Sequence, residues 1–162
     1  MIREAPRQTK RFDGTKLCRL PGCGNPVKPP MQSYCSPSCR EKFSIAYFPS
    51  STRWHVFQRD RGVCSICGTD TEKLRRILKT IRPRIMAQRI ARELGYHGSY
   101  SKGHFWQADH IRECVRGGWG TGLENLRTAC TPCHRAETAR LARERAEERK
   151  FTGSLFPVEA ER

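Results

Sequence analysis

The chain has 162 residues, of which 36% are hydrophobic and nine are cysteines, and its 31 lysine and arginine residues against 16 acidic residues give a formal net charge of +15. This length allows one ordinary domain or two small ones, and the low apolar content predicts that bound metal supplements a thin core. The charge favours a polyanionic partner that carries phosphates, and no stretch approaches the roughly 20 apolar residues that a membrane span needs.

The first segment, residues 1–16, is polar, basic and without hydrophobic periodicity, and we expect a flexible arm there. Its opening residues, MIREAPRQTK, contain no apolar signal-peptide core. We therefore expect an intracellular protein, in the cytoplasm or nucleoid, or in the nucleus if the host is eukaryotic. In such a reducing compartment, paired cysteines bind metal more often than they form disulfides.

A four-cysteine zinc finger is predicted over residues 17–47. The stretch CRLPGCGNPVKPPMQSYCSPSC contains two cysteine pairs, with glycines and an Asn-Pro turn that suit the knuckles of a metal site. Ser36–Ser38 can start a helix that continues over Arg40–Tyr47. The predicted ligands of this first structural zinc are Cys18, Cys23, Cys35 and Cys39.

A second domain is expected over residues 51–150, after a short linker at Phe48–Ser51. Thr52 is expected to cap a helix that runs to about Arg59. A CxxC pair follows, and a second CxxC pair lies far downstream, so the predicted ligands of a second structural zinc are Cys64, Cys67, Cys130 and Cys133. The gap between the pairs is much longer than in a simple zinc ribbon, which indicates an insertion.

The insertion, about residues 71–95, repeats apolar residues at helical spacing and is interrupted at Pro83, which predicts two consecutive helices. We expect an apolar face to pack inward and a basic face to contact phosphate; the alternative is a charged surface that is merely solvated. The candidate DNA-contacting residues are Arg75, Arg76, Lys79, Arg82, Arg84 and Arg89.

Beyond the insertion, HFWQADHI predicts a strand, CVRGGWGTGLENL predicts a loop and a second strand, and Pro132–Arg149 predicts a helix. The fold class is therefore α+β: a small zinc-stabilised domain with a helical insertion, preceded by a finger. Residues 151–162 are expected to form a flexible tail. The Leu-Phe pair in TGSLFP, within this tail, faintly resembles a sliding-clamp-binding peptide.

Four residues near the two strands form a candidate catalytic set. Asp109 and His110 are adjacent on the predicted first strand and project to opposite faces, so that one can hold a cation while the other addresses a phosphate. We expect His110 to be the general base, and Asp109 and His134 to hold a single Mg²⁺ or Mn²⁺. Asn125 is better suited to tying the loop together by hydrogen bonds than to binding metal.

Several motifs together resemble the ββα-metal HNH endonuclease family over about residues 52–145. They are CSICG, HFWQADHI with Gly117-Gly118 after it, ENL and CTPCH. With the finger motif YCSPSC and the insertion, the arrangement is similar to the C-terminal nuclease region of the vertebrate annealing helicases that carry a Ran-binding zinc finger. The resemblance implies metal-dependent hydrolysis of DNA that leaves 5′ phosphate and 3′ hydroxyl ends. It also implies branched DNA as a substrate and a helicase or translocase as a partner.

Two alternatives stay open. If the chain is an enzyme, it cuts duplex DNA at a specific sequence or it cuts DNA of a particular branched shape. The basic residues of the insertion fit both, because phosphate contacts position a protein without specifying sequence. In a different class, the chain is a zinc-scaffolded DNA-binding module that positions a partner protein without cutting.

Overall fold

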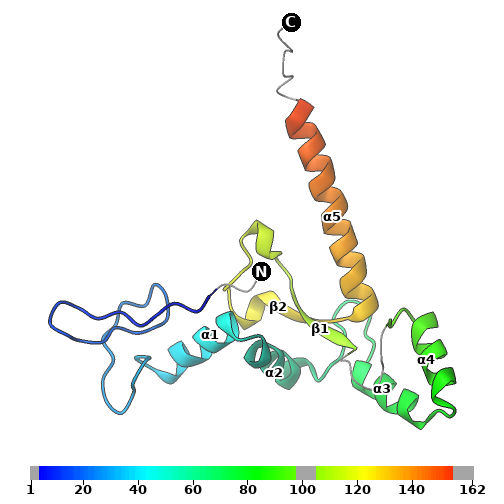
Figure 1. Cartoon of the computed structure of the whole chain (residues 1–162), viewed down its shortest axis with the longest axis horizontal. Coiled ribbons are helices and arrows are strands. Elements are labelled where there is room, and N and C mark those ends of the chain that lie inside the picture. The colour runs from blue at the N-terminus through cyan, green and yellow to red at the C-terminus, as the bar shows by residue number, and fades with distance from the viewer. Residues whose placement is uncertain (1–3, 98–104, 155–162) are drawn as a thin grey trace, which may run out of the picture. The chain divides into compact units, whose positions relative to one another are not determined.

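The computed structural model describes residues 4–97 and 105–154, which form helices and one small two-stranded sheet (Figure 1). The fold class predicted from the sequence, α+β with two four-cysteine clusters able to bind zinc, is confirmed. Within the described ranges, no helix is long and apolar enough to cross a membrane. The elements in chain order are α1 (Pro37–Tyr47), α2 (Pro49–Asp60), α3 (Thr71–Thr80), α4 (Arg84–Glu93), β1 (Trp106–His110), the short 3-10 turns η1 (Cys114–Arg116) and η2 (Leu123–Asn125), β2 (Leu126–Cys130) and α5 (Thr131–Ser154).

The chain divides into two compact units, and each unit is discontinuous in sequence. The first unit contains residues 1–62 and 108–128, and the second contains residues 63–107 and 129–162. The first unit therefore holds the finger, α2 and the segment from Ala108 to Thr128, whereas the second holds the insertion and α5. The tail expected over residues 151–162, with its clamp-like peptide, falls mainly on residues 155–162, which lie outside the described ranges.

The prediction of a flexible arm over residues 1–16 is wrong in part, because residues 9–17 form a hydrogen-bonded hairpin that leads into the finger. Lys10 and Lys16 make an antiparallel bridge, and the backbone N–H of Leu17 donates to the carbonyl of Thr9 at 2.9 Å. The side chain of Arg19 donates to the carbonyl of Pro6 at 2.7 Å. These bonds tie the hairpin to the chain that carries the first cysteines.

Helix α1 begins as the sequence predicts, because Ser36 caps it. The Ser36 hydroxyl accepts a hydrogen bond from the backbone N–H of Cys39 at 3.2 Å, and a proline occupies the first turn, where no N–H partner is needed. The predicted linker is wrong in part, because α2 starts at Pro49 and only the extended residue Phe48 separates the helices. Thr52 is not the cap: its hydroxyl donates to the carbonyls of Ile45 and Phe48 instead.

Strands β1 and β2 pair as an antiparallel hairpin. The N–H of Ile111 donates to the carbonyl of Asn125, and the N–H of Thr131 donates to that of Phe105, at 2.8 and 2.9 Å. This register sets Asp109 opposite Arg127. Helix α5 follows β2 without a gap, so the predicted order of strand, loop, strand and helix is confirmed. The prediction of a second strand within residues 114–126 is too early, because Leu123–Asn125 form a 3-10 turn and β2 begins only at Leu126.

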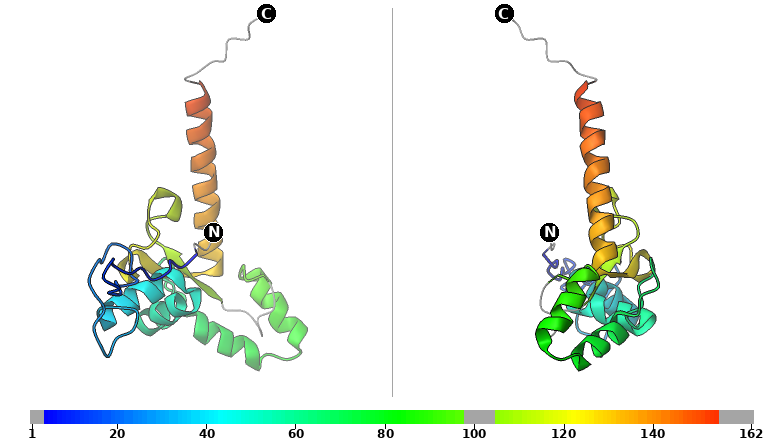
Figure 2. Two further views of the ribbon diagram at one scale, coloured as in Figure 1. Left: turned by 60° about the vertical axis from the view of Figure 1, so that its left-hand side comes forward. Right: turned by 90° about the vertical axis from the view of Figure 1, so that its right-hand side faces the viewer.

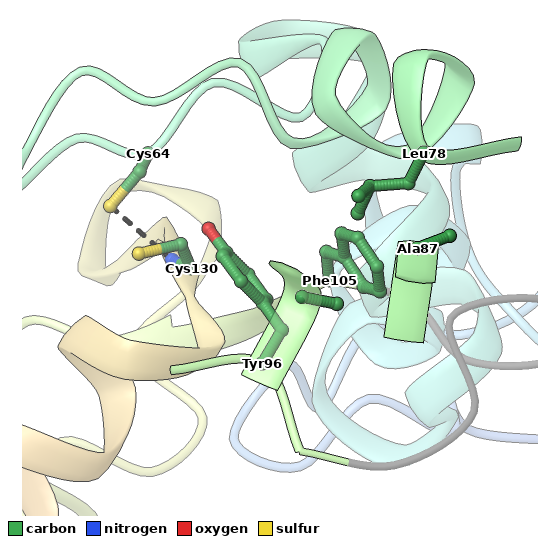
Figure 3. Close-up of a cluster of buried hydrophobic side chains, with 7 residues drawn as sticks. Cys64, Leu78, Ala87, Tyr96, Phe105 and Cys130 are labelled. Carbon is green, nitrogen blue, oxygen red and sulfur yellow. Dashed lines mark hydrogen bonds between the residues drawn. The ribbon is translucent and has the colours of Figure 1, made fainter. Parts of the chain in front are cut away.

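Two consecutive helices, α3 and α4, occupy the predicted insertion and meet near Pro83, and α5 is a single long rod (Figure 2). The expectation of an inward apolar face is right for Leu78, which is buried, but Ile77 and Ile85 are 50% and 70% exposed. The core of the second unit is small, and α3 and α4 each contribute one face to it. In Figure 3 the Tyr96 ring lies between the cysteine pair of Cys64 and Cys130 and the ring of Phe105.

Candidate active site and metal centres

The first four-cysteine cluster lies within a single short stretch of chain. Its members, Cys18, Cys23, Cys35 and Cys39, place their sulfur atoms within 4.8 Å of one another. The Sγ–Sγ distances are 3.5 Å for Cys23–Cys35, 3.8 Å for Cys23–Cys39 and 3.5 Å for Cys35–Cys39. A tetrahedral zinc with Zn–S bonds of about 2.3 Å separates its sulfurs by roughly 3.8 Å, so the four thiols fit the ion.

The second cluster joins two distant CxxC pairs inside the second unit. Its members, Cys64, Cys67, Cys130 and Cys133, meet the same 4.8 Å limit. The Sγ atoms of Cys67 and Cys130 are 3.6 Å apart, and the backbone N–H of Cys130 donates to the sulfur of Cys64 at 3.3 Å (Figure 3). Hydrogen bonds from Thr69 lower the pKa of Cys67 to about 6. Burial raises the pKa of Cys130 and of Cys133 in the same cluster, so the four thiols differ in acidity.

Asp109 and His110 end β1 and are half-buried. One carboxylate oxygen of Asp109 accepts from both Nε and Nη2 of Arg127, each at 3.0 Å. Burial lowers the pKa of His110, and the negative charge of Asp109 opposes part of that shift. His110 is therefore a neutral imidazole at neutral pH, the form that can accept a proton.

Sequence reasoning did not single out Arg127 as a partner of Asp109. The signal that identifies it is the register of the hairpin, because directly opposed residues on antiparallel strands bring their side chains together. That register depends on the pairing of Ile111 with Asn125, which no single motif reveals.

Asn125 ties the loop between the strands together, as the sequence predicts. Its side-chain oxygen accepts from the N–H of Arg112 at 2.8 Å, and its side-chain nitrogen donates to the carbonyls of Arg112 and Gly118 at 3.1 and 2.9 Å. Gly118 is required in this packing, since a Cβ there would lie 1.7 Å from the Arg112 carbonyl oxygen. One amide side chain thus fixes both ends of the turn that follows His110.

His134 lies in the first turn of α5, directly after the cluster ligand Cys133, and is half-buried. Its backbone carbonyl accepts a hydrogen bond from the Thr138 hydroxyl at 2.8 Å. Among the four candidate catalytic residues, the structure thus brings Asp109, His110 and Asn125 into the first unit, while His134 belongs to the second.

Three of the six candidate DNA-contacting residues already have protein partners. Arg75 pairs with Glu72 at 2.9 Å, Arg89 pairs with Glu93 at 3.2 Å, and Arg82 donates to the carbonyls at the end of α3. Arg76, Lys79 and Arg84 are exposed. All six lie on or between α3 and α4.

Comparisons with known proteins agree on one family. The family model for HNH endonucleases matches residues 95–140. The DNA annealing helicase and endonuclease ZRANB3 of Mus musculus is 33% identical over an alignment of 159 residues that covers 86% of this chain and 15% of that protein. ZRANB3 of Homo sapiens is 35% identical over an alignment of 127 residues that covers 72% of this chain and 12% of that protein. The chain therefore spans a small fraction of the length of these relatives.

A solved structure gives a further comparison. The crystal structure of the human ZRANB3 HNH domain is 35% identical in sequence, with a TM-score of 0.45. The match covers 62% of this chain and 95% of that chain.

Proposed function

The chain belongs to the HNH endonuclease family, and on that premise we propose that it hydrolyses phosphodiester bonds in DNA with the help of a divalent metal ion. The observation that carries this proposal is the position of the family match. Residues 95–140 include Asp109, His110, Asn125 and His134, and they also include the second CxxC pair.

His110 is the proposed general base, which takes a proton from the attacking water. Its lowered pKa supports this role, because a base must be unprotonated before it can act. Adjacent residues on a strand point to opposite sides, so Asp109 is free of that task and offers its carboxylate to a cation. Asn125 is proposed to keep the loop after His110 in one conformation.

Asp109 and His134 are the proposed ligands of a single Mg²⁺ or Mn²⁺. The carboxylate of Asp109 suits either ion, and the imidazole of His134, a donor typical of transition metals, favours Mn²⁺. When bound, the ion would supply positive charge for the phosphate and for the departing 3′ oxygen. The expected products carry a 5′ phosphate and a 3′ hydroxyl.

Two structural zinc ions are proposed for the two four-cysteine clusters, whose sulfur spacing fits tetrahedral zinc. The exposed basic residues of α3 and α4 are proposed to contact DNA phosphates. Because the chain resembles annealing helicases with endonuclease activity, branched DNA is the proposed substrate, and a helicase or translocase the proposed partner.

Cleavage of end-labelled DNA tests the proposed function. Wild type and His110→Ala are incubated with single strand, plain duplex, splayed-arm and flap DNA in Mg²⁺ or Mn²⁺, and binding is measured separately in EDTA. We expect cutting near the junction by wild type, no cutting by His110→Ala, and DNA affinities within a few-fold of each other. The matched control is His97→Ala, which removes an exposed histidine of the second unit.

Two results would contradict the proposal. If wild type binds every substrate and cuts none, the chain is a DNA-binding module that positions a partner. If His110→Ala cuts like wild type, the general base is a different residue.

A further inference from the structure

An ion pair at the end of α2 reaches across to the chain on both sides of Asn125. Nη1 of Arg59 donates to the carbonyl of Leu123 at 2.9 Å, and Nη2 donates to the carbonyl of Leu126 at 2.6 Å. These carbonyls flank Glu124 and Asn125, so one guanidinium fixes the two ends of the short η2 turn.

Asp60 completes the arrangement. Its Oδ1 accepts from Nε of Arg59 at 2.6 Å, and its Oδ2 accepts from Nη2 of Arg59 at 2.9 Å. The same Oδ2 accepts from the backbone N–H of Thr128 at 3.0 Å. The Asp60 side chain is 18% exposed, so water competes weakly for these bonds. The pair therefore holds three backbone groups of the segment 123–128.

This segment leads directly to the proposed catalytic loop. The carbonyl of Asn125 accepts from the N–H of Ile111, the residue after His110, and the Asn125 side chain bonds Arg112 and Gly118. The side-chain hydrogen bonds of Arg59 end at Leu123, Leu126 and Asp60. Asn125 is the direct hydrogen-bonded link from this backbone to residues 111–118.

We propose that Arg59 and Asp60 are a positioning pair for the nuclease site: they fix the backbone that carries Asn125, and Asn125 in turn fixes the loop after His110. The inference rests on the proposed function and adds residues that lie outside residues 95–140, the range of the family match. Arg59 acts through Asn125 and contacts no reacting atom, so it is not a catalytic residue.

The chemistry of the pair requires arginine. A planar guanidinium donates in several fixed directions at once, so it can bond Leu123, Leu126 and Asp60 together. A lysine in the same place keeps the charge beside Asp60 but offers a single ammonium group, which cannot hold both carbonyls in this geometry. Arg59→Lys thus separates charge from positioning.

The test is steady-state cleavage by Arg59→Gln and Arg59→Lys. A displacement of about 1 Å in a catalytic group lowers rates by up to about 100-fold, so we expect kcat to fall 10-fold to 100-fold for Arg59→Gln and less for Arg59→Lys, with KM within threefold of wild type. The matched control, Arg61→Gln, removes the same charge from an exposed residue next to the pair, and its kcat should be unchanged.

A double-mutant comparison identifies the route. If Arg59 acts through Asn125, then Arg59→Gln should lower kcat less than twofold in a chain that already carries Asn125→Ala. An equal loss in both backgrounds would overturn the proposal. So would a folded Arg59→Lys or Arg59→Gln with full kcat.

Hydrogen exchange measures the same coupling without any cleavage. In Arg59→Gln, backbone amides over residues 111–118 should exchange faster, although Arg59 does not bond them. Unchanged exchange there contradicts positioning even if wild type proves not to cut DNA, so failure of this inference and failure of the proposed function are distinguishable. Zinc content and circular dichroism accompany each variant. Loss of fold in both Arg59 variants would also overturn the proposal, because it would make Arg59 a folding residue only.

Discussion

The two four-cysteine clusters offer zinc the same ligands but join very different lengths of chain. The first takes its ligands from residues 18–39, and the second joins residues 64–67 to residues 130–133. In the second cluster Cys64 and Cys130 are 1% and 2% exposed and belong to the hydrophobic core, whereas in the first cluster only Cys18 is buried. Clusters with the same metal chemistry therefore differ in structural consequence: an ion in the first would organise a local loop, and an ion in the second would join distant parts of a unit.

Replacing one cysteine in each cluster tests whether the second cluster contributes more to stability than the first. Because a tie across a longer loop restricts the unfolded chain more, Cys130→Ser should cost about 4 kcal/mol or more, and Cys35→Ser about 2–3 kcal/mol. Zinc per chain, measured by mass spectrometry, should fall from two to one in both variants. Thermal unfolding should show the larger loss for Cys130→Ser, and equal losses would mean that loop length is not what distinguishes the clusters.

The loop of the first unit depends on close backbone packing rather than on metal. Gly118→Ala places a methyl group against the carbonyl of Arg112, so we expect a loss of about 2–3 kcal/mol together with reduced cleavage. The control is Gly120→Ala, which has a positive φ of 73° but open space around its Cα, and should cost about 1 kcal/mol. Urea unfolding of both variants measures the difference, and similar values would show that the loop moves aside for the methyl.

The first unit also contains a pH-dependent contribution to stability. Hydrogen bonds from Arg59 lower the pKa of Asp60, aided by Thr128 and opposed by burial. A carboxyl with a lowered folded pKa stabilises the fold above its unfolded pKa of about 3.9, and this stability is lost as pH falls through the folded value. Asp60→Asn removes charged hydrogen bonds and should cost about 1.5–3 kcal/mol at pH 7.

Thermal unfolding of wild type and Asp60→Asn between pH 7 and pH 2 measures how the stability contributed by Asp60 depends on pH. The gap between the two melting temperatures should narrow as the pH falls below about 4. A gap that stays constant down to pH 2 would mean that the carboxylate charge of Asp60 contributes nothing to the fold.

The surface of the second unit should give the smallest effects. Arg89 and Glu93 are 75% and 65% exposed, so Arg89→Gln should change stability by less than about 0.5 kcal/mol. If Arg89 contacts a phosphate, the slope of log affinity against log salt should fall by about 0.9. Fluorescence anisotropy over a salt series measures it, and an unchanged slope would assign Arg89 to the solvated surface alone.

Local chemistry made much of the fold predictable from the sequence. Ser36 predicts the start of α1 because its hydroxyl accepts a hydrogen bond from an N–H of the first turn. Pro83 predicts the break in the insertion because proline cannot continue α3. The spacing of the cysteines predicted both clusters. The role of Asn125 in its loop followed from the hydrogen-bonding capacity of an amide.

Contacts between distant segments were not predictable in this way. Arg127 bonds Asp109 because the hairpin adopts one register, and Asp60 bonds the N–H of Thr128 because the end of α2 lies against residues 123–128. The helical pattern likewise marks Ile77 and Ile85 as apolar, but it does not say that the available core is too small to cover them. Tertiary geometry decides these points, and no short motif encodes it.

The discontinuity of the first unit has a consequence for how the protein is made. On the ribosome the finger emerges before the β1–β2 hairpin and presents all four of its thiols to zinc. The backbone groups that Arg59 and Asp60 bond are complete only when Thr128 has been synthesised. Cys133 completes the second cluster shortly afterwards. We therefore expect a nascent chain that stops before β2 to bind zinc and yet to lack a formed catalytic loop. Such a timing would leave the loop after His110 unformed until synthesis has passed β2.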